Sequence, residues 1–255
     1  MQQLLNRIVP GVVAFTLLLF LQQVVAVPRQ VYAIGLISIV VLGLGVWQLA
    51  ERRLLSEKFW RFMLTPILFF VSSVLFLSFL EHAFLKQLLL LVVVLLIWVY
   101  LEVLYLWFHF RPRYQVHSLE NISSYLDLLT IFFTASSFLS ISVFLGLSVW
   151  YLVPVFAMIT GLVTYQLIWT SGAAFRSGLP YVLTIGLVAT ELFIAVSFLP
   201  TTAYVSGLAV GLPYYVMAGV SRNWLMGVRE AAVVRRYLII GMFGLLLVFA
   251  TAKWF

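Results

Sequence analysis

Three acidic side chains stand inside long apolar runs of the sequence, and they are the residues best placed to do chemistry. Glu191 lies near the middle of its run, Glu102 lies in the last third of another, and Asp127 lies just inside the start of a third. If these runs cross a bilayer, an acid at mid-depth costs about 2.5–3.5 kcal/mol on insertion scales. Each acid therefore either binds a proton, a cation or a substrate headgroup, or is kept neutral by hydrogen bonds to nearby hydroxyls. For Asp127 the dipole of a helix N-terminus offers a further structural explanation.

Two tyrosines are candidate partners for these acids. Tyr214 and Tyr215 fall in the run that follows Glu191, and their hydroxyls can bond a neutral carboxyl. The sequence shows no lysine or arginine deep in any run, so no ion pair is expected for Glu191, which favours the neutral form. We therefore predict an intramembrane polar site drawn from Glu191, Glu102, Asp127, Tyr214 and Tyr215.

Six arginines at the ends of the apolar runs form a second candidate set, for binding the phosphates of lipid headgroups. Within 221–236 the pattern is that of an amphipathic helix lying in the membrane interface, with Leu225 and Val228 able to face lipid. A simple connector with topogenic charges explains the same pattern. The candidate headgroup-binding residues are Arg111, Arg113, Arg222, Arg229, Arg235 and Arg236.

Metal and cofactor chemistry finds little support in the sequence. There are no cysteines, and the three histidines fall in loops on both predicted sides of the membrane. The metalloprotease HExxH, the phosphate-binding P-loop and the dinucleotide-binding GxGxxG patterns are absent. We predict no metal site and no cofactor, and the missing catalytic patterns argue against an enzyme without excluding one.

Membrane-spanning helices must position these residues. Of the 255 residues, 64% are hydrophobic and 9% are charged, whereas soluble domains have about 45–50% and about 25%. Because a span needs about 20 apolar residues and irregular backbone cannot face lipid, each long run predicts an α-helix. The expected class is an all-α, polytopic transmembrane helical bundle of about nine spans, at 8–26, 31–50, 62–80, 87–107, 124–145, 149–169, 180–199, 203–220 and 237–253.

Lysines and arginines predict how this bundle is oriented. With the N-terminus in the cytoplasm, twelve of the 15 basic residues fall in inner segments and three in outer ones, which is the asymmetry of the positive-inside rule. Nine spans then leave the C-terminus outside. We expect a multi-pass protein of the cell membrane, with membrane lipids and other membrane proteins as partners. The basic residues are too scattered to form a nucleic-acid-binding surface.

The two halves of the chain are similar to each other at a spacing of about 118 residues. Trp47-Gln48-Leu49 corresponds to Tyr165-Gln166-Leu167, and Ser78-Phe79-Leu80 corresponds to Ser197-Phe198-Leu199. We predict two tandem four-helix units in one orientation, although chance similarity between apolar segments would produce the same matches. The predicted organisation is a first four-helix unit at 1–107, a cytoplasmic linker at 108–123, a second four-helix unit at 124–220, an interfacial segment at 221–236 and a C-terminal span at 237–255.

Three stretches carry a resemblance to a known family. They are Ser118 to Tyr125, Glu191 to Gly207, and Arg235-Arg236-Tyr237 together with the closing Thr251 to Trp254. The chain resembles an uncharacterised family of multi-pass membrane proteins from small-genome, candidate-phylum bacteria. This resemblance implies a bacterial inner-membrane protein and brings no assigned activity.

Three functions are consistent with these observations. The first is a non-enzymatic, transporter-like bundle or a component of a membrane complex, which fits the repeat and the scarcity of polar groups. The second is a membrane-embedded enzyme acting on a lipid-linked substrate at the cytoplasmic face, with Glu102 and Asp127 near Arg111 and Arg113. The third is a scaffold in assembly of the cell envelope. We favour the first.

Overall fold

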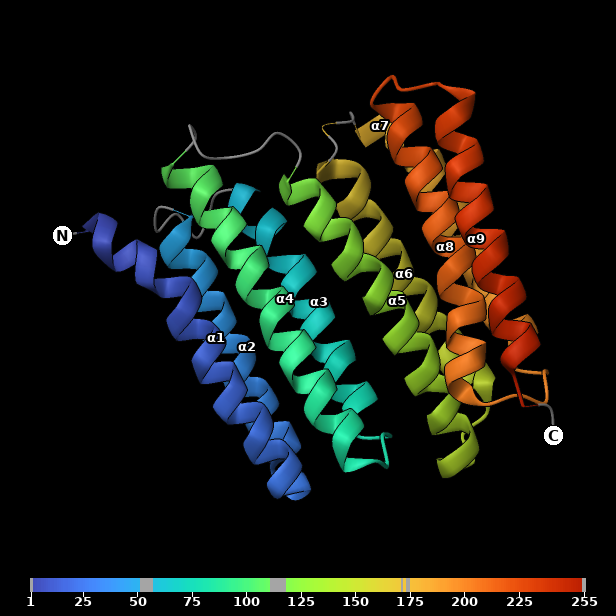
Figure 1. The fold of residues 1–255 in the computed structure, drawn as a ribbon, viewed down its shortest axis with the longest axis horizontal. Coiled ribbons are helices and arrows are strands. Elements are labelled where there is room, and N and C mark those ends of the chain that lie inside the picture. The colour runs from blue at the N-terminus through green and yellow to red at the C-terminus, as the bar shows by residue number, and fades with distance from the viewer. Residues whose placement is uncertain (1, 51–56, 111–117, 171, 173–174, 254–255) are drawn as a thin grey trace. The chain divides into compact units, whose positions relative to one another are not determined.

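The computed structural model describes residues 2–50, 57–110, 118–170, 172 and 175–253, and all regular structure within them is helical. A short 3-10 helix, η1 (Pro28–Gln30), joins the first two of nine α-helices in these residues. The α-helices, coloured from blue to red along the chain in Figure 1, are α1 (Gln2–Ala26), α2 (Val31–Leu49), α3 (Glu57–Leu77), α4 (Ala83–His109), α5 (Ser118–Leu145), α6 (Val149–Thr170), α7 (Phe175–Val196), α8 (Ala203–Leu225) and α9 (Ala231–Thr251).

Hydrocarbon, and not water, is the environment that these helices fit. Within the described residues, eight of them are long and apolar enough to cross a membrane, and the apolar part of α3, Phe62–Leu77, is shorter. Helices satisfy their own backbone hydrogen bonds, which is the condition for crossing lipid. The predicted all-α, polytopic class is therefore confirmed, and the protein is a multi-pass membrane protein.

The structure differs from the sequence expectation at the connection between α8 and α9. The segment 221–236, expected as one interfacial amphipathic helix, is divided among the end of α8, a tight turn and the start of α9. The turn is a Schellman motif, in which the Val228 N–H donates to the Asn223 carbonyl at 2.9 Å and Gly227 adopts φ +83°. Because that φ favours glycine, Gly227 ends α8 five residues later than we expected.

The first compact unit, Met1–Leu126, contains α1 to α4. Figure 1 shows α1 lying beside α4 and α2, and the pairs α1–α4 and α1–α2 are in direct contact. Polar side chains join α1 to α4 at both ends. Asn6 bonds His109 at 2.8 Å and accepts from Gln48 of α2 at 2.9 Å, while Gln22 and Gln87 form an amide pair with a 2.7 Å bond. These bonds hold the register of the α1–α4 interface.

The second compact unit, Asp127–Phe255, contains most of α5 and all of α6 to α9. Phe138 of α5, Phe156 of α6 and Phe193 of α7 meet in an apolar core, where the ring centroids of Phe156 and Phe193 are 4.4 Å apart and the rings are stacked.

Small residues bring α8 close to its neighbours. A Cβ on Gly207 would meet the Ser136 side chain of α5, and one on Gly244 of α9 would lie 3.1 Å from Leu212. Gly207 and Gly211 therefore lie at a close contact between α8 and α5.

Candidate functional site

A stripe of polar side chains runs along the buried side of α5. Asp127, Thr130, Thr134 and Ser137 follow one another at intervals of three, four and three residues, and none is more than 2% exposed. This spacing places them on one helix face. Apolar neighbours on the other faces of α5 explain why the helix still has the hydropathy of a membrane span.

Two other helices of the second unit add polar groups to this interior. Thr160 and Thr164 lie one turn apart on α6 and are fully buried, and the Thr164 hydroxyl donates to the Thr160 carbonyl at 2.7 Å. Tyr214 and Arg222 of α8 are two turns apart, with 1% and 8% of their surfaces exposed. We call Asp127, Thr160, Thr164, Tyr214 and Arg222 the polar cluster.

Electrostatic interactions connect three residues of the polar cluster. The Arg222 guanidinium attracts the Asp127 carboxylate, and the same carboxylate acts on the Tyr214 hydroxyl. A buried charge is costly unless it is paired and hydrogen-bonded, and the attraction of Arg222 offsets only part of the cost of burying Asp127, because burial itself is the larger effect. Arg222 was expected among the interfacial arginines. It belongs to the buried face of α8 because the helix continues to Leu225.

Several polar atoms of the cluster are left without a bond. Among the described residues, the Asp127 Oδ2, the Tyr214 hydroxyl and the Thr160 hydroxyl are fully buried and have no hydrogen-bond partner. Tyr214 lies beside Thr164, but the two hydroxyls do not reach ordinary hydrogen-bond geometry. Such groups cost about 1–3 kcal/mol each when unsatisfied, and they are the groups that a bound polar molecule would satisfy.

The cluster extends along the helices. From Tyr214, near the middle of α8, to Arg222, close to its C-terminal end, the rise is about 12 Å at 1.5 Å per residue. The arrangement offers an acceptor at Asp127, a permanent donor at Arg222 and hydroxyls that do both. These groups have the donors and acceptors that a small hydrogen-bonding solute requires. Within the described residues no group of three histidine, aspartate or glutamate side chains is arranged to hold a metal ion.

The other acids nominated from the sequence lie elsewhere. Glu191 is exposed on α7, five residues before that helix ends, and no hydrogen bond to its carboxyl is described. Its neighbour Thr190 donates to the Gly186 carbonyl at 2.7 Å instead. Tyr215 is half-buried and packs on Tyr237 of α9, with ring centroids 5.2 Å apart. The structure thus brings together Asp127 and Tyr214 of the five nominated residues.

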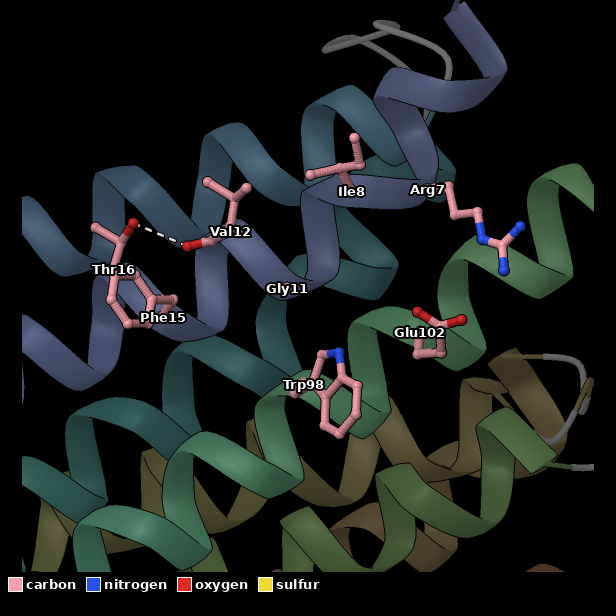
Figure 2. Close-up of a pocket in the computed structure, with 8 residues that line it drawn as sticks. All are labelled: Arg7, Ile8, Gly11, Val12, Phe15, Thr16, Trp98 and Glu102. Atoms are coloured by element: carbon pink, nitrogen blue, oxygen red, sulfur yellow. Dashed lines mark hydrogen bonds between the residues drawn. The ribbon is translucent and has the colours of Figure 1, made fainter.

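Glu102 lies in the first unit, whereas Asp127 lies in the second. The half-buried Glu102 side chain lines a groove between α1 and α4 together with Arg7 and Trp98, which Figure 2 shows. The enzyme hypothesis needed Glu102 and Asp127 near Arg111 and Arg113, and those two arginines lie outside the described residues.

The remaining candidate headgroup-binding arginines lie around the α8–α9 connection. Arg229 is exposed and its guanidinium lies 4.9 Å from the centre of the Trp224 ring. Arg235 and Arg236 are exposed in the first two turns of α9. Binding of lipid headgroups by Arg229, Arg235 and Arg236 therefore stays a prediction.

Sequence reasoning missed the two threonines of the polar cluster, Thr160 and Thr164, and the threonines and serine of the polar stripe on α5. Their signal was present, since the threonines of α6 are four residues apart and the polar residues of α5 follow a helical period. Single serines and threonines are common in membrane helices, because they can bond their own backbone. Only the packing of α5, α6 and α8 shows that these faces meet.

Comparison with known proteins identifies a family and adds no activity. The model of a family described as "Protein of unknown function (DUF5656)" matches residues 31–251, from the start of α2 to the end of α9. No curated protein and no solved structure matches the chain. The match confirms the expected relation to an uncharacterised family. Since it covers most of the sequence, the chain belongs to the DUF5656 family.

Proposed function

We propose that this protein is a non-enzymatic, transporter-like membrane protein whose polar cluster binds a small polar solute. One observation carries the proposal. A carboxyl group, a guanidinium and three hydroxyl side chains from three membrane helices converge inside the second unit, and three of their polar atoms are buried without a hydrogen-bond partner. Ionisable residues inside membrane spans usually mark a substrate or ion pathway.

Energetic cost argues against a purely structural role for the cluster. Apolar side chains would fill the same space without desolvating a charge, and buried ion pairs are often no more stable than such replacements. Small residues already provide close packing between α5 and α8 at Gly207 and Gly211. The presence of Asp127 and Arg222 in the interior is therefore better explained by a ligand than by helix association.

Orientation follows from the charges. We place the N-terminus in the cytoplasm and the C-terminus outside, because this assignment puts twelve of the 15 basic residues on the inner side. The α8–α9 connection is then cytoplasmic, and the polar cluster leads from that side to the middle of the membrane. We also propose that α1–α4 and α5–α8 are tandem repeats. In support, the first helix of each set contacts the fourth, α1 with α4 and α5 with α8.

Access of water to the cluster tests the function. The chain has no cysteine, so single-cysteine variants can be labelled without background. We expect Thr164→Cys to react with the membrane-impermeant 2-(trimethylammonium)ethyl methanethiosulfonate in inside-out vesicles, because a transporter must open its site to one side. Thr160→Cys repeats the test one turn away. Reactivity is read from loss of subsequent maleimide labelling in denaturant.

The matched control is Val163→Cys, which is equally buried and lies one residue from Thr164. It should stay unmodified until the protein is denatured. If both threonine positions are as unreactive as Val163→Cys in vesicles of either orientation, water does not reach the polar cluster. The transport proposal is then wrong.

A further inference from the structure

The groove between α1 and α4 is a second site, separate from the polar cluster. It encloses about 770 Å³, within the range of small-molecule pockets, and it opens on the surface of the first unit. Ile8, Val12 and Phe15 form one wall, and each is more than half exposed. In a membrane this wall faces hydrocarbon, so it suits an acyl chain.

A glycine opens the groove. Gly11 lies between the apolar residues of α1, and a Cβ built on it would meet no atom within 4 Å. The helix backbone is thus uncovered at the centre of the groove. The side-chain bonds between α1 and α4, Asn6 with His109 and Gln22 with Gln87, lie outside the groove at its two ends. They fix the helix spacing, so the groove persists when it is empty.

Two oppositely charged side chains, Arg7 and Glu102, lie at the same end of the groove. Figure 2 shows the Arg7 guanidinium on α1 and the Glu102 carboxylate on α4 reaching toward one opening, with the Trp98 indole one turn further along α4. Within the described residues no ion pair joins Arg7 to Glu102. Each charge is therefore available to a ligand that carries the complementary pair of charges.

We propose that this groove binds a phospholipid with a primary ammonium in its headgroup, that is, phosphatidylethanolamine. Arg7 bonds the lipid phosphate, for which a guanidinium is well matched. Glu102 accepts hydrogen bonds from the ammonium, and the acyl chain lies along Ile8, Val12 and Phe15. Arg7 is the sixth residue of α1 and Glu102 is seven residues before the end of α4, so both lie about 10 Å or less from the helix ends, where headgroups meet acyl chains.

Headgroup chemistry separates this lipid from its relatives. Phosphatidylcholine carries the same charges, but its quaternary ammonium has no N–H to donate to Glu102. Phosphatidylglycerol has no cation, and Glu102 would repel its negative charge. We therefore expect the protein to retain phosphatidylethanolamine more strongly than phosphatidylcholine or phosphatidylglycerol.

The experiment is native mass spectrometry of the full chain. The protein is released from nanodiscs with equal parts of the three lipids, all with identical acyl chains. We expect phosphatidylethanolamine to be retained about fivefold to tenfold over phosphatidylcholine, the effect of roughly one charge-assisted hydrogen bond at a half-exposed site. Glu102→Gln should remove this preference while phospholipid is still bound, and Arg7→Gln should weaken retention of all three.

A pair of glycine variants locates the bound lipid. Gly11→Leu fills the groove and should reduce retention of every phospholipid. Gly35→Leu adds the same bulk on α2, where a Cβ also meets nothing within 4 Å, and should leave retention unchanged. Equal retention of the three headgroups by the wild type would overturn the proposal. So would a Gly11→Leu variant that keeps its lipid, or a wild type that holds a partner helix in the groove in place of lipid.

Discussion

At the scale of single residues, the electrostatic attraction between Asp127 and Arg222 should contribute to the stability of the second unit. Both side chains are at least 92% buried, and their charges attract. Asp127→Leu or Arg222→Met alone removes one of two attracting buried groups and should cost up to about 3–5 kcal/mol, the upper range being that of a broken buried ion pair. The double variant removes both charges and should recover most of that loss. Unfolding by sodium dodecyl sulfate, followed by circular dichroism, measures the four stabilities.

Arg229→Gln is the control for loss of one positive charge near the end of α8. Arg229 is exposed and contacts the Trp224 ring, an interaction worth about 0.5–1 kcal/mol at most at an exposed site. If the losses of Asp127→Leu and Arg222→Met simply add in the double variant, the two charges are not coupled and the polar cluster has been misassigned.

These two residues also show where sequence reasoning reached its limit. Asp127 could be nominated because an acid inside an apolar run is conspicuous on its own. Arg222 was nominated only as a headgroup-binding residue, because its buried position depends on where α8 ends, and helix ends are uncertain by several residues. Glu191 had the same sequence signal as Asp127, yet it lies on an exposed face of α7. When a helix is apolar on all sides, the spacing of its apolar residues in the sequence does not indicate which face is buried.

At the scale of helices, the approach of α8 to α5 depends on Gly207. A Cβ there would meet the Ser136 side chain and would lie 3.1 Å from the Phe132 carbonyl oxygen. Gly207→Ala should therefore destabilise the protein by about 1–3 kcal/mol, the usual cost of overpacking. The detergent unfolding midpoint measures this change.

Gly161→Ala on α6 is the matched control, because a Cβ at that position meets nothing within 4 Å. It should be neutral or slightly stabilising, since alanine is the better helix former by about 1 kcal/mol. Equal effects of the two substitutions would mean that Gly207 is not at a close helix contact.

Helix positions were the most predictable part of the fold. Each of the nine predicted spans overlaps one observed helix, because lipid requires long apolar helices and leaves few alternatives. The least accurate region was 221–236, where amphipathic periodicity concealed the stop at Gly227. A single glycine is ambiguous in sequence, since it is tolerated inside membrane helices and also ends them. The φ of +83° at Gly227, which is visible only in the structure, identifies this glycine as a helix end.

At the scale of the whole molecule, the orientation depends on α3 crossing the membrane. Its described apolar part, Phe62–Leu77, is shorter than the other spans. If α3 did not cross, every later segment would change sides, and the arginines from Arg111 onward would move outside. That arrangement would lose the positive-inside asymmetry. We therefore predict nine crossings.

Cysteine labelling in intact cells tests this prediction, because the chain has no cysteine of its own. Three exposed connections are suitable, at Val27, Glu81 and Val228. With nine crossings and a cytoplasmic N-terminus, an impermeant maleimide should label Val27→Cys and Glu81→Cys, and should reach Val228→Cys only after permeabilisation. Labelling of Val27→Cys and Val228→Cys without Glu81→Cys would show that α3 does not cross. Labelling of Val228→Cys alone would place the N-terminus outside, and the polar cluster would then lead to the outer surface.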